Sequence, residues 1–439
     1  MSVPSPGRLR SINETYKVFA ETADEIDEHA KFHFSAKDNL CAKGFQARAG
    51  SRILEGYRPP FDATAIARLR AAGGALIGKT NMDEFGFGTF STNSGFEVPR
   101  NPFDLERACG GSSGGAAAAT ILLEGHVALG VSTGGSIACP ASFCGVLGLA
   151  PTYGRVSRYG LIDYANSLDK IGLLARSSKD LRKYLPLVSG ADPKDPTSCV
   201  QPPLQMDKSE IRSIVVPEDA LKNMSPSVRS GFDSAMDILR SDGIDVVMTS
   251  MPSLRFALPA YYILATSEAS TNLARYCGMR FGVRGTNVSQ HFNDFFSEVR
   301  SEHFGQEAKR RILLGTYARM VGFRDRYYIK ALSVRQTIIA EYEKAFRKGD
   351  LVLTPTMPFI APKFADIEKM RPLEVYQADF LTVPPNLAGL PHISVPCAYT
   401  EGMPIGMQFV APHWEERCLL EIADLWTSRF KIRFPEVRT

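Results

Sequence analysis

The stretch CGGSSGGAAAATILLEGHVALGVSTGGSIACPASFCGVLGLA (109–150) carries two clusters of glycine and hydroxyl residues around a run of small apolar residues. The run Ala116–Leu123 consists of helix formers and predicts a buried helix, and Val127–Val131 predicts a short strand. The clusters, GGSSGG (110–115) and STGGS (132–136), would then be loops beside the helix N-terminus and after the strand, where unpaired N–H groups gather. If each loop places a hydroxyl beside these N–H groups, the arrangement suits acyl transfer, with a nucleophile next to an oxyanion hole. Alternatively, the two loops are flexible turns or a phosphate-binding cradle.

The rest of the chain predicts an α/β fold, with a large mixed central sheet covered by helices on both faces, because helical patterns alternate with short buried strands. Residues 1–30 are expected to form an N-terminal helical segment, followed by one domain over 31–439 in which 258–348 is mostly helical. Helices are predicted at 12–31, 62–73 and 225–239, with Asp62 and Ser225 as N-caps. Strands are predicted at 32–36, 75–77, 211–216, 244–249 and 350–354, with strands and turns over 384–396 and 403–410, and a new segment is expected to open over 79–85.

Composition indicates a soluble globular protein, with 44% hydrophobic and 22% charged residues among 439. The net charge of +4 is spread along the chain and gives no argument for nucleic acid. The sequence shows no signal-peptide pattern and no apolar run long enough to span a membrane. The eight cysteines form no C-x-x-C pair, so a zinc site is not expected and a reducing compartment is the simplest account. We expect a cytoplasmic location, with the mitochondrial matrix as the alternative.

Three short motifs match other kinds of site. Gly73–Thr80 fits the nucleotide-binding G-x-x-x-x-G-K-T pattern, but a helix precedes it where a strand is needed. Gly110–Gly114 fits the hydrolase G-x-S-x-G pattern, but no histidine, His392 included, is marked as a partner. Ser167–Lys170 fits S-x-x-K without its companion motifs. A nucleotide-binding switch and a non-catalytic scaffold therefore stay open as alternatives to an enzyme.

GGSSGG followed by STGGSIACPASFCG, with AKDN (36–39) upstream, resembles the amidase signature family. The segments at 77–89 and 166–172 extend the likeness, and those at 261–276, 307–318 and 378–396 resemble the A subunits of glutamyl/aspartyl-tRNA amidotransferases. The resemblance covers about residues 30–430. It implies the amidase signature fold over 31–439 and hydrolysis of a carboxamide.

The family's Ser–cis-Ser–Lys triad maps onto three residues of this sequence. By that resemblance Ser136 is the nucleophile, Ser112 is the bridging serine on a cis peptide, and Lys37 is the base. The oxyanion hole would be formed by backbone N–H groups of Thr133, Gly134, Gly135 and Ser136. A lysine needs a desolvated position to act as a base near neutral pH, and the end of an apolar strand offers one.

The resemblance also assigns a glutamine site and partners. Tyr262, Arg311 and Asp379 would hold glutamine, with a one-residue slip to Tyr261 or Arg310 open. Arg311 and Asp379 would match the carboxylate and the ammonium.

The implied role is a glutaminase subunit that supplies ammonia to a B subunit, which uses ATP and Mg to amidate Glu-tRNA(Gln), Asp-tRNA(Asn) or both. A small C subunit would complete a heterotrimer, with tRNA bound mainly by the partner and no cofactor in this chain. A stand-alone amidase for small carboxamides is the alternative.

Two positions depart from the family pattern, which commonly has Asp before TGGS and Arg two residues after the nucleophile. Here Ser132 and Ala138 occupy them. Neither position belongs to the triad. The two substitutions therefore affect the residues that would support the nucleophile loop and not the triad itself.

Overall fold

An eleven-stranded mixed sheet forms the centre of the protein in the computed structural model, which describes residues 5–198, 200–286 and 291–437. The strand order is β1-β3-β2-β6-β8-β7-β12-β13-β11-β9-β10. Pairing is parallel in β3-β2-β6 and in β11-β9-β10 and antiparallel elsewhere. The strands are β1 (Phe19–Thr22), β2 (Phe32–Lys37), β3 (Gly74–Thr80), β6 (His126–Ser132), β7 (Leu147–Ala150), β8 (Lys170–Ala175), β9 (Ser213–Pro217), β10 (Asp245–Thr249), β11 (Leu351–Pro355), β12 (His392–Thr400) and β13 (Met403–Val410). A separate hairpin joins β4 (Arg100–Asn101) to β5 (Asp104–Ala108).

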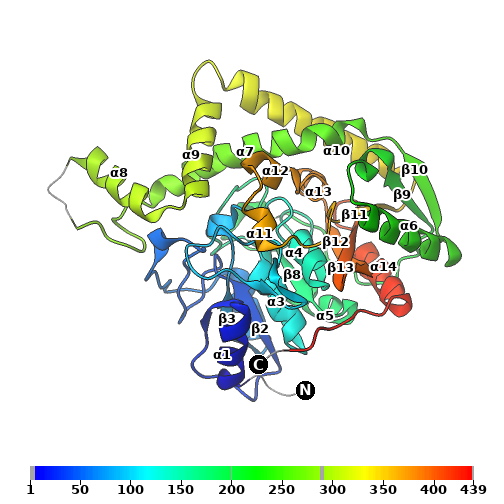
Figure 1. Cartoon of the computed structure of the whole chain (residues 1–439), viewed down its shortest axis with the longest axis horizontal. Coiled ribbons are helices and arrows are strands. Elements are labelled where there is room, and N and C mark those ends of the chain that lie inside the picture. The colour runs from blue at the N-terminus through cyan, green and yellow to red at the C-terminus, as the bar shows by residue number, and fades with distance from the viewer. Residues whose placement is uncertain (1–4, 199, 287–290, 438–439) are drawn as a thin grey trace.

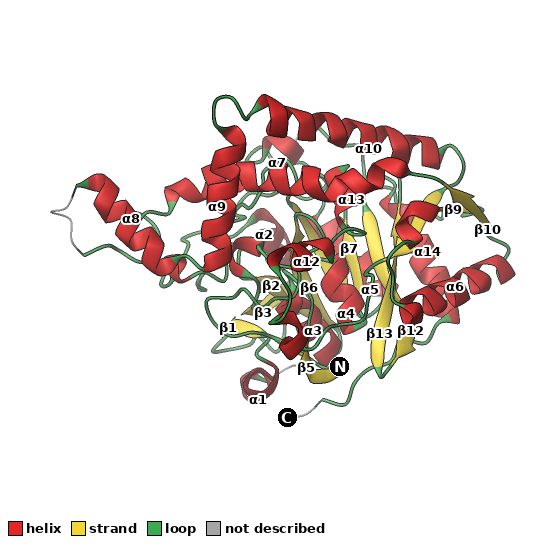
Figure 2. Cartoon of the chain, turned by 45° about the horizontal axis from the view of Figure 1, so that its top comes forward, coloured by secondary structure: helices red, strands yellow, loops and turns green. Residues whose placement is uncertain are grey.

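Helices cover both faces of this sheet, as predicted (Figure 1, Figure 2). On one face, apolar side chains of β6 and its neighbours pack against α2 (Thr64–Ala71), α5 (Ser178–Val188), α6 (Pro226–Ser241) and α14 (Glu416–Arg429). The other face packs against α1 (Pro6–Tyr16), α3 (Gly114–Leu122), α4 (Ala138–Cys144), α7 (Ala257–Asn272) and α10 (Lys330–Phe346). Alternate residues of β6 show why, because Val127 and Leu129 enter the first core and Ala128 the second.

The described part of residues 258–348 is mostly helical, as predicted. Besides α7 and α10 it contains α8 (Phe292–His303), which projects from the body in both views, and α9 (Gln306–Arg319) (Figure 1, Figure 2). Three short helices, α11 (Phe364–Ile367), α12 (Pro372–Gln377) and α13 (Val383–Leu387), follow β11.

The helix predicted over residues 12–31 is wrong, because the chain is helical only as far as Tyr16. Helix α1 ends at Tyr16, where Lys17 takes a left-handed conformation, and Phe19–Thr22 adds an edge strand to the central sheet by pairing with β3. Asn13 fixes this turn, since its side chain accepts from the N–H of Phe19 and donates to its carbonyl. The division of the chain at residues 30/31 stays a prediction.

Two other local predictions also need correction. Asp62 does not cap α2, because its carboxylate accepts from the backbone of Lys43 and from Arg70, and Ala63 holds the N-cap position without a side-chain bond. The strand predicted at 75–77 is longer and includes Lys79, because pairing with β1 on one side and β2 on the other carries β3 to Thr80. The next segment therefore opens after Thr80 and not at Lys79, and a 3-10 helix begins at Glu84. By contrast, Ser225 caps α6 as predicted.

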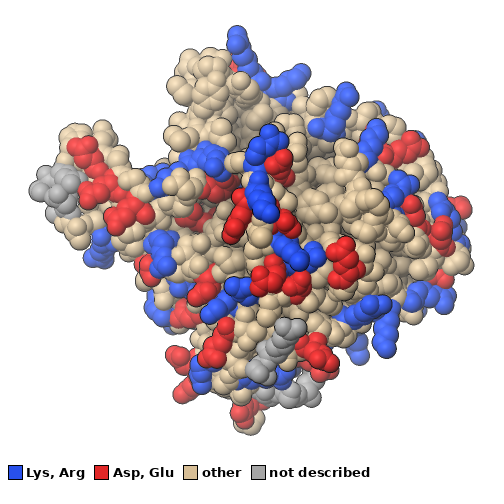
Figure 3. All heavy atoms as spheres, in the orientation of Figure 1, with Lys and Arg blue, Asp and Glu red and all other residues tan. Residues whose placement is uncertain are grey.

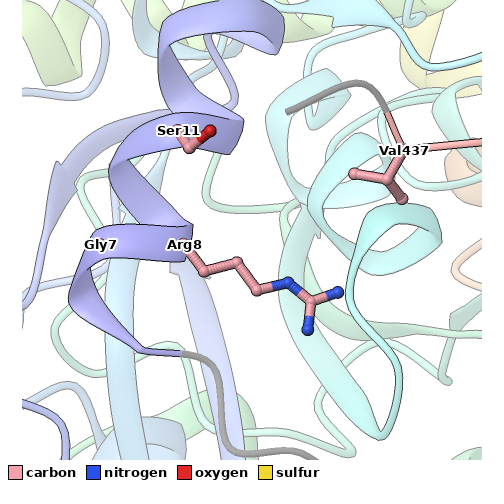
Figure 4. A pocket seen from close by; sticks show the side chains of 4 residues that line it. All are labelled: Gly7, Arg8, Ser11 and Val437. Carbon is pink, nitrogen blue, oxygen red and sulfur yellow. The ribbon is translucent and has the colours of Figure 1, made fainter.

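The C-terminal segment returns towards α1. A pocket of about 540 Å³ lies between them, lined by Gly7, Arg8, Ser11 and Val437 (Figure 4). No helix within the described ranges is long and apolar enough to cross a membrane.

Candidate active site

The residues predicted as the triad lie near the carboxyl ends of two parallel strands. Lys37 is the last residue of β2, and β2 pairs with β6, which leads into the second glycine loop. Because parallel strands end at the same edge, Lys37 and the loop after Ser132 lie together. The first glycine loop reaches the same place: Lys37 and Ser113 both donate to the carbonyl of Val131 in β6, over 3.1 Å and 3.2 Å.

Lys37 and Ser112 are in direct contact. The amine Nζ of Lys37 donates to Ser112 Oγ over 2.7 Å, and the Gly111–Ser112 peptide is cis, as the resemblance predicts. Both side chains are buried, at about 1% exposure. Burial lowers the pKa of Lys37 from 10.5 to about 7, against the opposing charges of Asp83 and Asp169. The lysine therefore meets the predicted requirement for a base near neutral pH.

Ser136 lies in the loop between β6 and α4 and is almost buried. Thr89 joins this loop to the first: its carbonyl accepts from the N–H of Gly111 and from Cys139 Sγ in α4. Within the described residues no hydrogen bond links Ser136 Oγ to Ser112. Hydrogen bonds between catalytic groups are often long until substrate binds, so the arrangement is compatible with a relay from Ser136 through Ser112 to Lys37.

The loop over 133–136 also presents backbone donors. In the part of the chain that the structure describes, the N–H groups of Gly134, Gly135 and Ser136 donate to no acceptor. Unpaired donors at the start of a helix, here α4, suit a developing oxyanion.

Two residues that sequence reasoning missed anchor this loop. Thr133 Oγ1 donates to Asp169 over 2.6 Å, and the Asn386 amide donates to the carbonyls of Thr133 and Leu168. Asp169 also accepts from the N–H groups of Tyr164 and Ala165, so its carboxylate fixes two segments at once. Ser132, at the position where the family commonly has Asp, donates to the carbonyl of Gly134 over 3.1 Å. The signal for Asp169 was its place in the family-like segment NSLDKIG (166–172).

Asp83 is a second buried carboxylate that the sequence did not single out. Its oxygens accept from the N–H groups of Ser91 and Asn93, over 3.0 Å and 2.9 Å. A Cβ on Gly111 would lie 2.2 Å from this carboxylate, so only glycine lets the first loop approach it. Burial raises the pKa of Asp83 to about 6, against its backbone hydrogen bonds and the charge of Lys37.

Asp379 and Tyr262 form one end of the predicted substrate site. Asp379 is buried and accepts from Thr89 Oγ1 over 2.8 Å and from the Tyr262 hydroxyl over 3.5 Å, while its Oδ1 has no partner among the described residues. Burial raises its pKa to about 7, against the hydrogen bond from Thr89 and the charge of Arg311. A buried carboxylate oxygen without a partner costs free energy unless a ligand supplies a donor.

Arg311 forms the other end and is only 3% exposed. It donates to Glu307 over 2.8 Å and to the Tyr164 hydroxyl, and its guanidinium lies 5.0–5.5 Å from four aromatic rings, those of Phe87, Tyr164, Tyr262 and Tyr376. Glu307 also accepts from the Tyr376 hydroxyl over 2.6 Å. Arg311 is thereby held in one orientation.

Arg310 and Tyr261, the alternatives to Arg311 and Tyr262 that a one-residue slip would give, lie in different surroundings. Arg310 is 43% exposed and pairs with Glu307, so the geometry selects Arg311. Tyr261 and Tyr262 both reach the site: the Tyr261 hydroxyl would be 2.9 Å from a Cβ on Gly134, whereas Tyr262 contacts Asp379. Tyr261 therefore packs on the loop over 133–136, and Tyr262 packs beside the Asp379 carboxylate.

The three competing motifs do not form sites. Lys79 is fully buried within β3, donates to the carbonyls of Asp38 and Gln46, and lies 3.6 Å from the Asp38 carboxylate, so Gly73–Thr80 is a strand and not a phosphate loop. His392 is buried beside the Leu390 carbonyl and is not the partner of Ser112. Ser167 and Lys170 turn apart: Ser167 donates to Glu268 and Lys170 to the Leu390 carbonyl.

A family model described as Amidase matches residues 14–420. The A subunit of the glutamyl-tRNA(Gln) amidotransferase of Persephonella marina is 43% identical, over 94% of this chain and 86% of its own length. The chain belongs to the amidase family. The like-named protein of Methanospirillum hungatei is 46% identical, over 89% of this chain and 90% of its own.

Solved amidase structures confirm the predicted amidase signature fold. The A subunit of the glutamyl-tRNA(Gln) amidotransferase of Thermotoga maritima superimposes with a TM-score of 0.84 at 33% identity, covering 98% of this chain and 93% of that one. A 6-aminohexanoate cyclic dimer hydrolase superimposes with a TM-score of 0.82 at 25% identity, covering 98% and 93%. The same fold therefore occurs in proteins named for quite different substrates.

Gly135→Ala is expected to lower amide hydrolysis by this amidase at least about 100-fold, the usual effect of losing one oxyanion donor. The new Cβ would lie 2.2 Å from Thr382 Oγ1 and 3.2 Å from Asp379, so the loop has to move. Ammonia release measures the loss. Gly7→Ala in α1, where the Cβ meets nothing closer than 4.0 Å, is the matched control and should keep wild-type turnover. Full activity of Gly135→Ala would show that this loop does not hold the reacting group.

Proposed function

We propose that this chain is the glutaminase subunit of a tRNA-dependent amidotransferase, with Ser136, Ser112 and Lys37 as its catalytic triad. The observation that carries the proposal is a pair of buried side chains of opposite charge. Asp379 lies beside the loop of Ser136, and the Arg311 guanidinium lies over the ring of Tyr262, whose hydroxyl donates to Asp379. Free glutamine has a carboxylate for Arg311 and an ammonium group for Asp379. The names of the relatives, which are A subunits of glutamyl-tRNA(Gln) amidotransferases, support the same role.

The reaction begins with proton transfer. Neutral Lys37 takes a proton from Ser112, which takes one from Ser136, and Ser136 Oγ attacks the side-chain carboxamide carbon of glutamine. The N–H groups over 133–136 stabilise the oxyanion. The relay then returns the proton to the leaving nitrogen, so that ammonia departs and a glutamyl ester remains on Ser136. Water, deprotonated through the same relay, hydrolyses the ester to glutamate.

The released ammonia would pass to a partner B subunit. That partner would bind tRNA and use ATP and Mg to activate Glu-tRNA(Gln), Asp-tRNA(Asn) or both, with a small C subunit completing the heterotrimer. Among the described residues no cluster of three or more His, Cys, Asp or Glu side chains is placed to hold a metal ion.

Reconstitution tests this role. The chain is combined with B and C subunits from the same genome, and ammonia release and Gln-tRNA formation are measured with and without ATP and Glu-tRNA(Gln). We expect glutamine-dependent Gln-tRNA formation only in the complex. Rapid hydrolysis of many small carboxamides by the isolated chain, with no Gln-tRNA formed by the complex, would instead identify a stand-alone amidase.

A further inference from the structure

Large apolar side chains are exposed together at one corner of the molecule, where α9 ends and the chain turns into α10. Leu313 is 71% exposed and Val321 fully exposed. We call this group of residues the α9 corner patch: Leu313, Leu314, Tyr317, Met320, Val321 and Tyr327. Single exposed apolar residues are ordinary, but a contiguous group marks an interaction site.

The α9 corner patch is continuous. The ring of Tyr317 lies 4.4 Å from that of Phe323 and 5.9 Å from that of Tyr327, centre to centre. Leu313 and Tyr317 are one helical turn apart and share a face of α9. The patch therefore extends from the outer face of α9 across the turn to the π-helical segment Asp325–Ile329, which leads into α10.

Helix α9 has its large apolar residues on the outside, the reverse of an ordinary surface helix. Its inner face carries Ala308, Gly315 and Ala318 beside Arg311. A Cβ on Gly315 would lie 1.8 Å from the Thr266 carbonyl, so α9 packs backbone to backbone on α7. The leucines face solvent instead. A helix that is apolar on both faces is normally covered on both.

Positive charge surrounds the patch. Arg324, Arg326 and Lys330 lie in the segment that follows α9, with Asp325 as the acid among them. Arg324, Arg326 and Lys330 are exposed, and no ion pair joins them to a carboxylate within the described ranges. Figure 3 shows the uncharged surface at the top of the molecule with Lys and Arg side chains beside it and little acidic surface.

We propose that the α9 corner patch is the docking surface for an acidic amphipathic helix of another protein chain. Apolar side chains of that helix cover Leu313, Leu314 and Tyr317, and its carboxylates pair with Arg324, Arg326 and Lys330. A polyanion such as tRNA would pair with the basic residues but leave the aliphatic side chains exposed to water. A protein partner therefore matches this surface better than a nucleic acid does. Docking would also fix the outer side of the helix whose inner side holds Arg311 and Glu307.

The test rests on the proposed function, because it uses the B and C subunits as the partner. Three variants are compared with wild type for the dissociation constant of the complex: Leu313→Ser/Tyr317→Ser, Arg324→Glu/Arg326→Glu, and the control Met248→Ser, an exposed apolar residue on β10. We expect at least about tenfold weaker binding for the first two, the usual size of an interface hot spot, and no change for the control. Added salt should weaken the wild-type complex and strengthen that of the charge-reversed variant.

The other outcomes separate the two proposals. Wild-type binding by both patch variants, with unchanged melting temperatures, overturns the docking surface and leaves the proposed function standing. The same holds if the patch variants lose only tRNA binding, or only self-association of this chain. If wild type itself forms no complex and no Gln-tRNA, the proposed function fails and the docking proposal fails with it.

Discussion

Replacing Ser136 with alanine is expected to abolish glutamine-dependent amidation, by at least about 10,000-fold in kcat, as removal of a serine nucleophile does in other hydrolases. The alanine has no hydroxyl to attack the carboxamide, while the loop over 133–136 stays in place. Amidation with added ammonium should continue at the wild-type rate, because ammonia enters after this step. The measurement is Gln-tRNA formation by the reconstituted complex with glutamine or ammonium as the nitrogen source.

Ser142→Ala provides the matched control. Ser142 is also buried and lies in α4, six residues beyond Ser136, but among the described residues it makes no hydrogen bond to Lys37 or Ser112. It should retain glutamine-dependent activity. If Ser136→Ala loses the ammonium reaction as well, the serine serves assembly of the complex and not the attack on glutamine. A labelled glutamine analogue attached at another residue would argue against the nucleophile directly.

The second large effect concerns Lys37 and pH. Burial lowers its pKa to about 7, so the neutral amine is the minor form below that pH and the main form above it. Glutaminase kcat should therefore rise about tenfold per pH unit below pH 7 and level off above it. Saturating glutamine is needed, because Asp379 also has a pKa of about 7 and must be ionised to bind the substrate ammonium. At saturating glutamine, the titration of Asp379 changes mainly KM and leaves kcat to report Lys37.

The Lys37→Arg variant distinguishes a role of Lys37 as a base from a role that needs only its positive charge. Arginine keeps the positive charge but does not deprotonate in proteins, so the variant should stay inactive with glutamine at every pH. Ammonium-dependent amidation should persist. A Lys37→Arg enzyme with a normal pH profile would mean that another group accepts the proton of Ser112.

The elements around the decisive stretch were predictable because local patterns and tertiary packing agree there. The helix predicted at 116–123 and the strand at 127–131 appear as α3 and β6, with ends that differ by at most two residues. The failures lie where long-range pairing overrides local preference. The polar segment after Tyr16 reads as helix by itself, but pairing with β3 makes it a strand.

The residues of the site also fall into those that the sequence could predict and those that it could not. Lys37 and Ser112 could be placed by resemblance, and their contact agrees with it. Asp83 and Asp169 lie within the family-like segments 77–89 and 166–172, but nothing in the sequence shows that their carboxylates are buried. Their role depends on backbone N–H groups of distant loops, which only the folded chain brings together.

The residues of this site are spread from position 37 to position 379, and strands β12 and β13, which follow Asp379, complete the middle of the sheet. A growing polypeptide on the ribosome thus cannot assemble this site until nearly all of it has been synthesised.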